Sequence, residues 1–194
     1  MTPEKILQSR LTSNRLEKPI GLDLELPLSY QLDQEYCSAL SSELPGTWEA
    51  RRATKGLWRT LPEECGIYMF VFQIPFQLTA EGGKINPSYV LYIGRAGDAN
   101  SRRTFRDRYK GEYDKYIEGD PAALWENKPI NSRSEKLKKY LTIYPLEYWF
   151  YRIEDRSKIS SIESKLIRFL NPPLNTVGRV KLKKVSESPA FKEH

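Results

Sequence analysis

Glu163 is the residue whose type and setting point most directly to chemistry. It lies in Ser160–Asn175, where the pattern predicts a short helix that ends before Pro172 and Pro173. At about 100° per residue, its carboxylate falls within an apolar stripe made of Ile162, Leu166, Ile167, Phe169 and Leu170. A carboxylate that faces the body of a protein must be paired, metal-bound or protonated, because burying an unpaired charge is costly. Two interpretations stay open: a capping box formed by Ser160 and Glu163, or a functional carboxylate.

The residue types that are scarce in the chain argue against several mechanisms. The single histidine is His194, the last residue of the sequence, so a triad or a nuclease site built on a central histidine is not expected. The two cysteines, Cys37 and Cys65, have no metal-ligand spacing, and neither a zinc site nor a disulfide framework is indicated. The missing internal histidine is the strongest exclusion that the sequence supports.

The composition predicts one globular domain with an appendage in a chain of 194 residues. Hydrophobic residues make up 39% of the chain, which is enough for a packed core. The 31 basic and 25 acidic residues give a net charge of +6, which suits a polyanionic partner. The first residues lack an apolar signal region and no run reaches membrane-spanning length, so we expect a cytoplasmic protein without a membrane partner.

Three stretches rich in β-branched and aromatic residues are expected to form strands, namely Gly66–Ile74, Tyr89–Gly94 and Leu146–Ile153. Helices are expected over residues 104–117 and 133–141, and over the stretch that carries Glu163. The first of these helices should bury one face, made of Phe105, Tyr109, Tyr113, Tyr116 and Ile117. The order β-β-α-α-β-α predicts an α+β fold with a small three-stranded antiparallel sheet flanked by helices.

Further segments are expected to surround this core. Residues 1–60 are predicted to form a partly helical N-terminal extension. Its segment Trp48–Thr60 mixes basic and aromatic residues, and it is either a DNA-contacting arm or a surface segment whose tryptophans pack on the core. Gln77–Ser88 and Glu118–Ser132 are predicted to be loop insertions. The basic tail at residues 177–194 is either an electrostatic arm or a solvated chain end.

Two tyrosine-containing triplets fall on strands that are expected to be adjacent. They are Gly66-Ile67-Tyr68 and Tyr92-Ile93-Gly94, and an arginine-bearing helix, Glu163 and the ending Pro-Pro-Leu-Asn175 follow them. In this combination and order, the motifs resemble the GIY-YIG nuclease family, with the nuclease domain at residues 61–176. Each triplet alone would carry little weight, because strand tyrosines usually pack against a core.

The resemblance implies a role for each motif residue. Tyr68 and Tyr92 match the tyrosines of the two triplets, Glu163 the metal-binding glutamate, and Asn175 the asparagine that closes the motif. Under this resemblance Glu163 is a metal ligand rather than a cap residue.

The catalytic arginine of the family has two candidate positions in this sequence. Arg108 has the expected apolar neighbours on the predicted helix, whereas strict counting from Tyr92 ends near Arg102 or Arg103. Some relatives also carry a histidine or tyrosine one turn after the arginine. This chain has Glu112 there, with Tyr113 next, and so departs from that part of the pattern.

These residue types suit phosphodiester hydrolysis. One Mg²⁺ or Mn²⁺ ion held by Glu163 would neutralise phosphoryl charge and stabilise the leaving group. Arg108 would bind a non-bridging phosphate oxygen with its forked donors. Tyr68 is the candidate base for the attacking water, a role that requires nearby positive charge to lower its pKa. Tyr92 would position phosphate or water, and Asn175 would orient Glu163 or brace its loop.

The expected function is a metal-dependent endonuclease that cuts double-stranded DNA at a specific site, most like a stand-alone restriction-type enzyme. The two insertions would reach into the DNA grooves. A palindromic site would call for a homodimer, or for one monomer acting twice. The alternatives are a non-catalytic nucleic-acid-binding module on the same scaffold, or a repair or mobile-element nuclease, whose chains are usually longer.

Overall fold

The computed structural model describes residues 34–74, 76–119, 132–142 and 146–178. Three predicted segments lie wholly or partly outside the described residues: the N-terminal extension up to residue 33, residues 120–131 of the second insertion, and the tail from residue 179.

The main sheet contains β1 (Glu49–Arg52), β2 (Gly66–Gln73), β5 (Ser88–Ala96) and β6 (Leu146–Arg152). Its strand order is β1-β6-β2-β5, and all neighbours are antiparallel. The α+β class is therefore confirmed.

The main sheet has four strands, so the prediction of three was wrong. The strand that was missed, β1, has the sequence Glu-Ala-Arg-Arg and pairs with β6 from Glu49↔Phe150 to Arg52↔Glu147. Such a polar segment has no β-branched or aromatic residue, and its strand conformation comes from pairing with β6 rather than from intrinsic propensity. It lies within the segment Trp48–Thr60, whose two tryptophans pack against the core.

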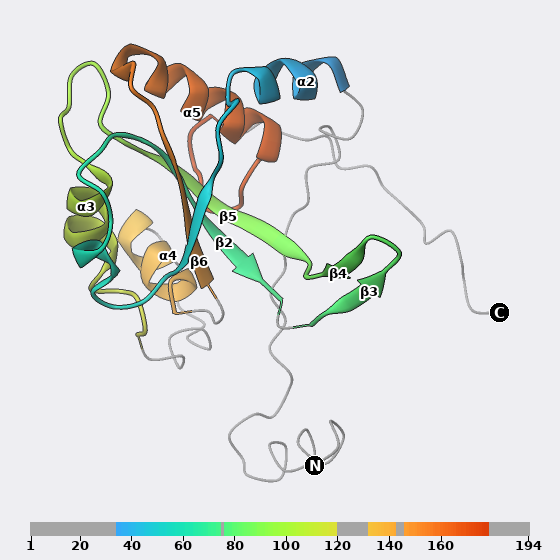
Figure 1. The fold of residues 1–194 in the computed structure, drawn as a ribbon. Coiled ribbons are helices and arrows are strands. Elements are labelled where there is room, and N and C mark those ends of the chain that lie inside the picture. The colour runs from blue at the N-terminus through green and yellow to red at the C-terminus, as the bar shows by residue number, and fades with distance from the viewer. Residues whose placement is uncertain (1–33, 75, 120–131, 143–145, 179–194) are drawn as a thin grey trace, which may run out of the picture.

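The first insertion contains a small hairpin of its own. Its strands are β3 (Leu78–Ala80) and β4 (Gly83–Ile85), which pair with each other and not with the main sheet. The hairpin projects from the end of the sheet, away from the helices (Figure 1). Leu78 and Ile85 lie opposite each other across its strands and are both exposed.

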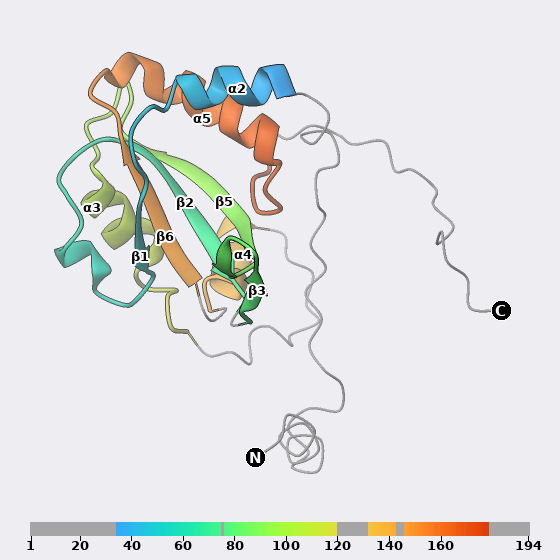
Figure 2. The same cartoon turned by 45° about the vertical axis from the view of Figure 1, so that its right-hand side comes forward.

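Helices cover both faces of the main sheet (Figures 1 and 2). The helix α2 (Gln34–Ser42) and the long helix α5 (Arg156–Leu170) lie on one face, and α3 (Phe105–Arg108) and α4 (Arg133–Tyr140) lie on the other. Alternate residues of β2 face opposite sides, so Ile67 and Met69 join the cluster under α5 while Tyr68 and Phe70 join the cluster under α3. A short 3₁₀ helix, η2 (Leu57–Arg59), follows β1.

The helix that carries Glu163 begins earlier than predicted. Its N-cap is Asp155, whose carboxylate accepts a hydrogen bond from the backbone N–H of Ser157 at 3.1 Å. Ser160 therefore lies inside the helix, and the interpretation of Ser160 and Glu163 as a capping box was wrong. The apolar stripe is confirmed, because Ile162, Leu166 and Ile167 are buried against the sheet.

The glycine of the first triplet is required by a close approach between β2 and β6. A Cβ atom built on Gly66 would lie 2.0 Å from the backbone oxygen of Tyr151, and the φ angle of Gly66 is +155°. No other residue fits this position without moving the neighbouring strand.

Candidate active site

Tyr68 and Tyr92 lie on the face of the sheet covered by α3, together with a third tyrosine. The hydroxyl oxygens of Tyr68 and Tyr113 are 2.5 Å apart, which is a short hydrogen bond between two buried side chains. The ring of Tyr92 lies 6.3 Å, centroid to centroid, from the ring of Tyr68 and 6.3 Å from that of Tyr113. The structure thus brings the tyrosines of both triplets together.

Tyr113 reaches Tyr68 because the helix that contains it changes its hydrogen-bonding pattern. After α3, residues Tyr109–Tyr113 form a π-helical turn, η3, in which the N–H of Asp114 donates to the carbonyl of Tyr109 at 2.9 Å. Glu112 pairs with Arg108 four residues before it, while Tyr113 turns toward Tyr68. The helix predicted for residues 104–117 is therefore helical only from Phe105 to Tyr113 and changes from α to π within that stretch. Of its predicted buried tyrosines, Tyr109 and Tyr113 are buried and Tyr116 is partly buried.

The glycine of the second triplet makes room for the tyrosine of the first. Tyr68 and Gly94 are directly opposite each other on β2 and β5. A Cβ atom on Gly94 would lie 2.5 Å from Oη of Tyr68 and 2.6 Å from its Cζ. The Tyr68 ring therefore crosses β5 at the one position without a side chain, which fixes where its hydroxyl lies.

Arg108 is the least exposed of the three candidate arginines. Its side chain is 22% exposed and donates from Nη1 to Glu112, while its Nε is buried and has no hydrogen-bond partner among the described residues. Burial alone would lower the pKa of Arg108, but the hydrogen bond to Glu112 and the charge of its carboxylate raise it. Arg102 is exposed, and Arg103 is 63% exposed with its Nη1 3.6 Å from Glu112.

Glu163 is held by an arginine that the sequence analysis did not single out. Its side chain is 13% exposed, and Oε2 accepts a hydrogen bond from Nη1 of Arg95. Burial raises the pKa of the Glu163 carboxyl, and the guanidinium groups of Arg95 and Arg108 oppose that rise. Arg95 directly follows the second triplet on β5 and faces the α5 side, as strand alternation from Gly94 would have indicated.

The candidate site therefore has two parts near the end of β5. Tyr68, Tyr92 and Arg108 lie on one face of the sheet, and Glu163 with Arg95 lies on the other. The side chain of Glu163 accepts a hydrogen bond from Arg95, whereas the hydroxyl of Tyr68 is hydrogen-bonded to Tyr113. The electrostatic effect of Arg108 on the Glu163 carboxyl links the two parts.

Tyr68 does not have the lowered pKa that a tyrosine base would need. Burial raises its pKa well above the ordinary value, and the neighbouring Tyr92 and Tyr148 raise it further. The hydrogen bond from Tyr113 lowers it, but not enough to offset burial. In this state Tyr68 is a neutral hydroxyl that shares a hydrogen bond with Tyr113.

Asn175 braces β5, and its side chain is hydrogen-bonded to Ile93 rather than to Glu163. Its buried side chain accepts a hydrogen bond from the Ile93 N–H at 2.9 Å and donates one to the Ile93 carbonyl at 2.8 Å. The adjacent N–H of Leu174 donates to the Leu91 carbonyl at 3.0 Å. Of the two roles considered for Asn175, the structure supports bracing the loop against the strand.

Replacing Asn175 by alanine should lower the free energy of unfolding by about 2 kcal/mol, because two buried backbone groups of Ile93 lose their partners. Asn175→Asp should cost more, since its carboxylate would face the Ile93 carbonyl. The exposed Asn86, whose amide oxygen accepts from Gln77, is the control, and Asn86→Ala should change stability by less than about 0.5 kcal/mol. Urea unfolding of the variants measures these differences, and equal effects at both positions would contradict the bracing role.

The donor set around Glu163 suits a hard divalent cation. No group of three or more histidine, cysteine, aspartate or glutamate side chains that could hold a metal ion occurs in the described part of the chain. Mg²⁺ and Mn²⁺ do not need such a group, because they are bound through one or two carboxylates and keep waters and phosphate oxygens as other ligands. A single, mostly buried carboxylate at the end of the sheet fits this pattern.

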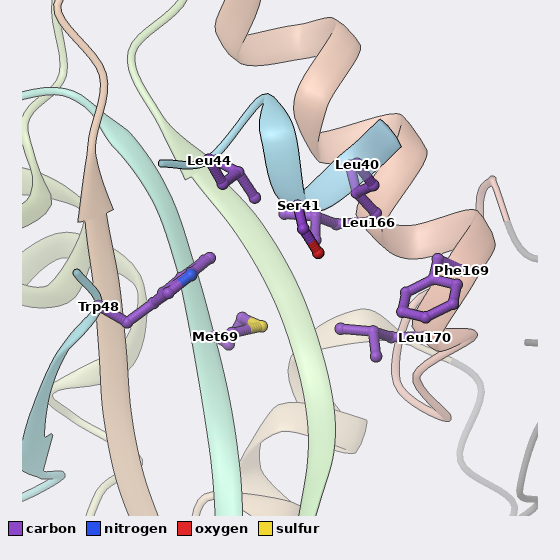
Figure 3. Close-up of a pocket in the computed structure, with 8 residues that line it drawn as sticks. All are labelled: Leu40, Ser41, Leu44, Trp48, Met69, Leu166, Phe169 and Leu170. Atoms are coloured by element: carbon purple, nitrogen blue, oxygen red, sulfur yellow. The ribbon is translucent and has the colours of Figure 1, made fainter. Parts of the chain in front are cut away.

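An apolar pocket of about 290 Å³ lies between the sheet and α5 (Figure 3). The tyrosines belong to the core cluster on the opposite face of the sheet. It is open to the surface, lies among α2, α5 and β2, and is lined by Leu40, Ser41, Leu44, Trp48, Met69, Leu166, Phe169 and Leu170. None of these side chains is ionisable in the physiological range. The pocket therefore adds no catalytic group to the candidate site.

Comparisons of the chain with protein-family models, with curated proteins and with solved structures gave no match. Within the ranges that the structure describes, no helix is long and apolar enough to span a membrane.

Proposed function

We propose that this chain is a divalent-metal-dependent endonuclease of the GIY-YIG type that hydrolyses phosphodiester bonds of double-stranded DNA at a specific site. The observation that supports this most strongly is the interlocking of the two triplets, in which the Tyr68 ring crosses β5 over Gly94. Packing of the strands needs only an apolar ring at position 68. Hydrolysis, in contrast, needs a hydroxyl group that is held in a fixed position. A partly buried arginine beside that hydroxyl is what a phosphate would require.

Arg108 is the residue proposed to bind the scissile phosphate. In the free protein its guanidinium pairs with Glu112, and its Nε has no partner in the described part of the chain. A phosphate oxygen can accept from this unsatisfied donor, and a planar fork suits two phosphate oxygens. Phosphate binding would thus satisfy a buried donor that has no hydrogen-bond partner among the residues that the structure describes.

The hydrogen-bonded pair Tyr68–Tyr113 is proposed to orient the attacking water. Because burial keeps both hydroxyls neutral, Tyr68 can accept a hydrogen bond from the water while its own proton is shared with Tyr113. Tyr92, beside both rings, would contact the phosphate or the water. This arrangement assigns Tyr68 an orienting role first, with proton transfer limited by its raised pKa.

Glu163 is proposed to hold one Mg²⁺ or Mn²⁺ ion. When bound, such an ion neutralises charge on the phosphoryl oxygens and on the leaving oxygen. The chain's own contribution is to keep the Glu163 carboxylate mostly buried on the rigid helix α5, within electrostatic reach of Arg108. The β3–β4 hairpin, which lies in the first insertion, is proposed to contact a groove of the DNA.

The proposal is tested by incubating the purified protein with plasmid DNA in the presence of Mg²⁺, and in parallel with EDTA. Discrete fragments that require Mg²⁺ are expected, and sequencing their ends would give the recognition site and the stagger. A smear would instead indicate a nuclease without sequence specificity. Salt-sensitive DNA binding with no hydrolysis of any DNA would overturn the proposal in favour of a non-catalytic nucleic-acid-binding module.

A further inference from the structure

Arg95 stands between two carboxylates at the end of β5. Its Nη1 donates to Oε2 of Glu163, and its Nε donates to Oδ2 of Asp98 at 3.1 Å. Both carboxylates are less exposed than the arginine that joins them. The guanidinium therefore occupies one of the two carboxylate oxygens of Glu163 and places a positive charge beside the carboxylate.

The bond from Arg95 to Asp98 is the more firmly anchored of the two. The N–H of Asn100 donates to Oδ1 of Asp98 at 2.8 Å, which holds the carboxylate in place. Nη2 of Arg156, at the start of α5, donates to the carbonyls of Asp98 and Ser101, each at 2.7 Å, and this fixes the loop. Arg95 can thus release Glu163 and remain attached to Asp98 through Nε.

We propose that Arg95 is an exchangeable counter-ion of Glu163, which a divalent cation displaces when it binds, so that Arg95 lowers the metal affinity of the site. The inference rests on the proposed function, because it takes Glu163 as the metal ligand. A guanidinium and a metal ion cannot both occupy the same carboxylate oxygen, and the positive charge of each disfavours the other. The pair also keeps the Glu163 carboxylate from being buried without a partner when no metal is present.

Arg108 is not proposed as a counter-ion of Glu163. It acts on the Glu163 carboxyl through its charge, but its hydrogen bond goes to Glu112 on its own helical segment. Arg95 is the side chain that must move for the Oε2 atom of Glu163 to accept a metal ion. This makes Arg95 a residue that tunes metal affinity, separate from the phosphate-binding role proposed for Arg108.

The test measures Mn²⁺ binding to the full chain, without DNA, by the loss of the free-ion electron paramagnetic resonance signal. Arg95→Gln should bind Mn²⁺ about tenfold more tightly than the wild-type protein, a coupling of ordinary size for two competing events. Arg106→Gln is the matched control. Arg106 also pairs with a glutamate, Glu63, and its side chain is 35% exposed against 34% for Arg95, so the same charge is removed from a similar surface. Its Mn²⁺ affinity should equal that of the wild type.

A third variant, Glu163→Gln, separates failure of this inference from failure of the proposed function. If Glu163→Gln abolishes Mn²⁺ binding while Arg95→Gln binds no more tightly than wild type, the counter-ion role of Arg95 is overturned and the metal site stands. If Glu163→Gln binds Mn²⁺ as the wild type does, or if no protein binds it, the metal role of Glu163 itself fails. Should Arg95→Gln not fold, Arg95→Lys replaces it. Lysine lacks the second donor that spans Glu163 and Asp98, so this variant should still bind Mn²⁺ several-fold more tightly than wild type.

Discussion

Replacing Glu163 by glutamine should reduce the single-turnover rate of DNA cleavage by at least about 10³-fold, because the carboxylate proposed to hold the metal is lost and metal ions contribute several kcal/mol of transition-state stabilisation. Affinity for DNA should change little, since it depends mainly on contacts between basic side chains and phosphates. The variant should fold, because Arg95 keeps its bond to Asp98 and the amide has nearly the shape of the carboxylate. Quenched-flow cleavage with Mg²⁺ and binding assays without Mg²⁺ measure the two effects.

The matched control for this variant is Glu43→Gln. Glu43 also pairs with a cation of α5, Lys165, but it is far more exposed than Glu163. Its replacement should leave cleavage within about twofold of wild type, as surface ion pairs contribute little. Cleavage by Glu163→Gln or Glu163→Ala at the wild-type rate would rule out the metal role.

Replacing Arg108 by lysine should lower the cleavage rate by about 10²-fold, the usual cost of losing one positioned donor to the developing charge. Lysine keeps the positive charge but not the planar fork, so the expected loss comes from geometry rather than from charge. The same substitution at Arg103 should change the rate by less than about twofold. Both arginines lie close to Glu112, and both substitutions preserve net charge, so their comparison isolates the position of the guanidinium.

Single-turnover rates at saturating protein decide between the two arginines. A larger effect at Arg103 than at Arg108 would assign the catalytic arginine to the position that strict counting from Tyr92 favours. Equal, small effects at both positions would show that neither guanidinium contacts the scissile phosphate.

Much of the fold followed from local patterns in the sequence. The strands β2, β5 and β6 are rich in aromatic and β-branched residues, and β2 is buried on both faces in the centre of the sheet. The stripe of α5 was predictable because its period of 3.6 is clear from Ile159 to Leu170. The strand β1 was not, since Glu-Ala-Arg-Arg is a strand only through its partner β6.

The residues of the candidate site were proposed from motifs in the sequence, whereas the side chains that pair with them were not predicted. The position of Glu163 in an apolar stripe required a partner, and the structure supplies Arg95, which lies 68 positions away in the sequence. The contact of Tyr113 with Tyr68 depends on the π-helical turn, which shifts the side chains after Arg108 away from the regular helical period. The sequence pattern was interpreted with a constant helical repeat, so a local π-helical turn could not be predicted from it.

The hydrogen bonds of Leu174 and Asn175 have a consequence for how the molecule behaves in concentrated solution. The strand β5 forms an outer edge of the main sheet, where unpaired N–H and carbonyl groups would invite a strand from another molecule. Leu174 and Asn175 already bond to Leu91 and Ile93 along this edge, so an incoming strand would have to displace them. The segment that closes the motif thus also protects the molecule against edge-to-edge aggregation.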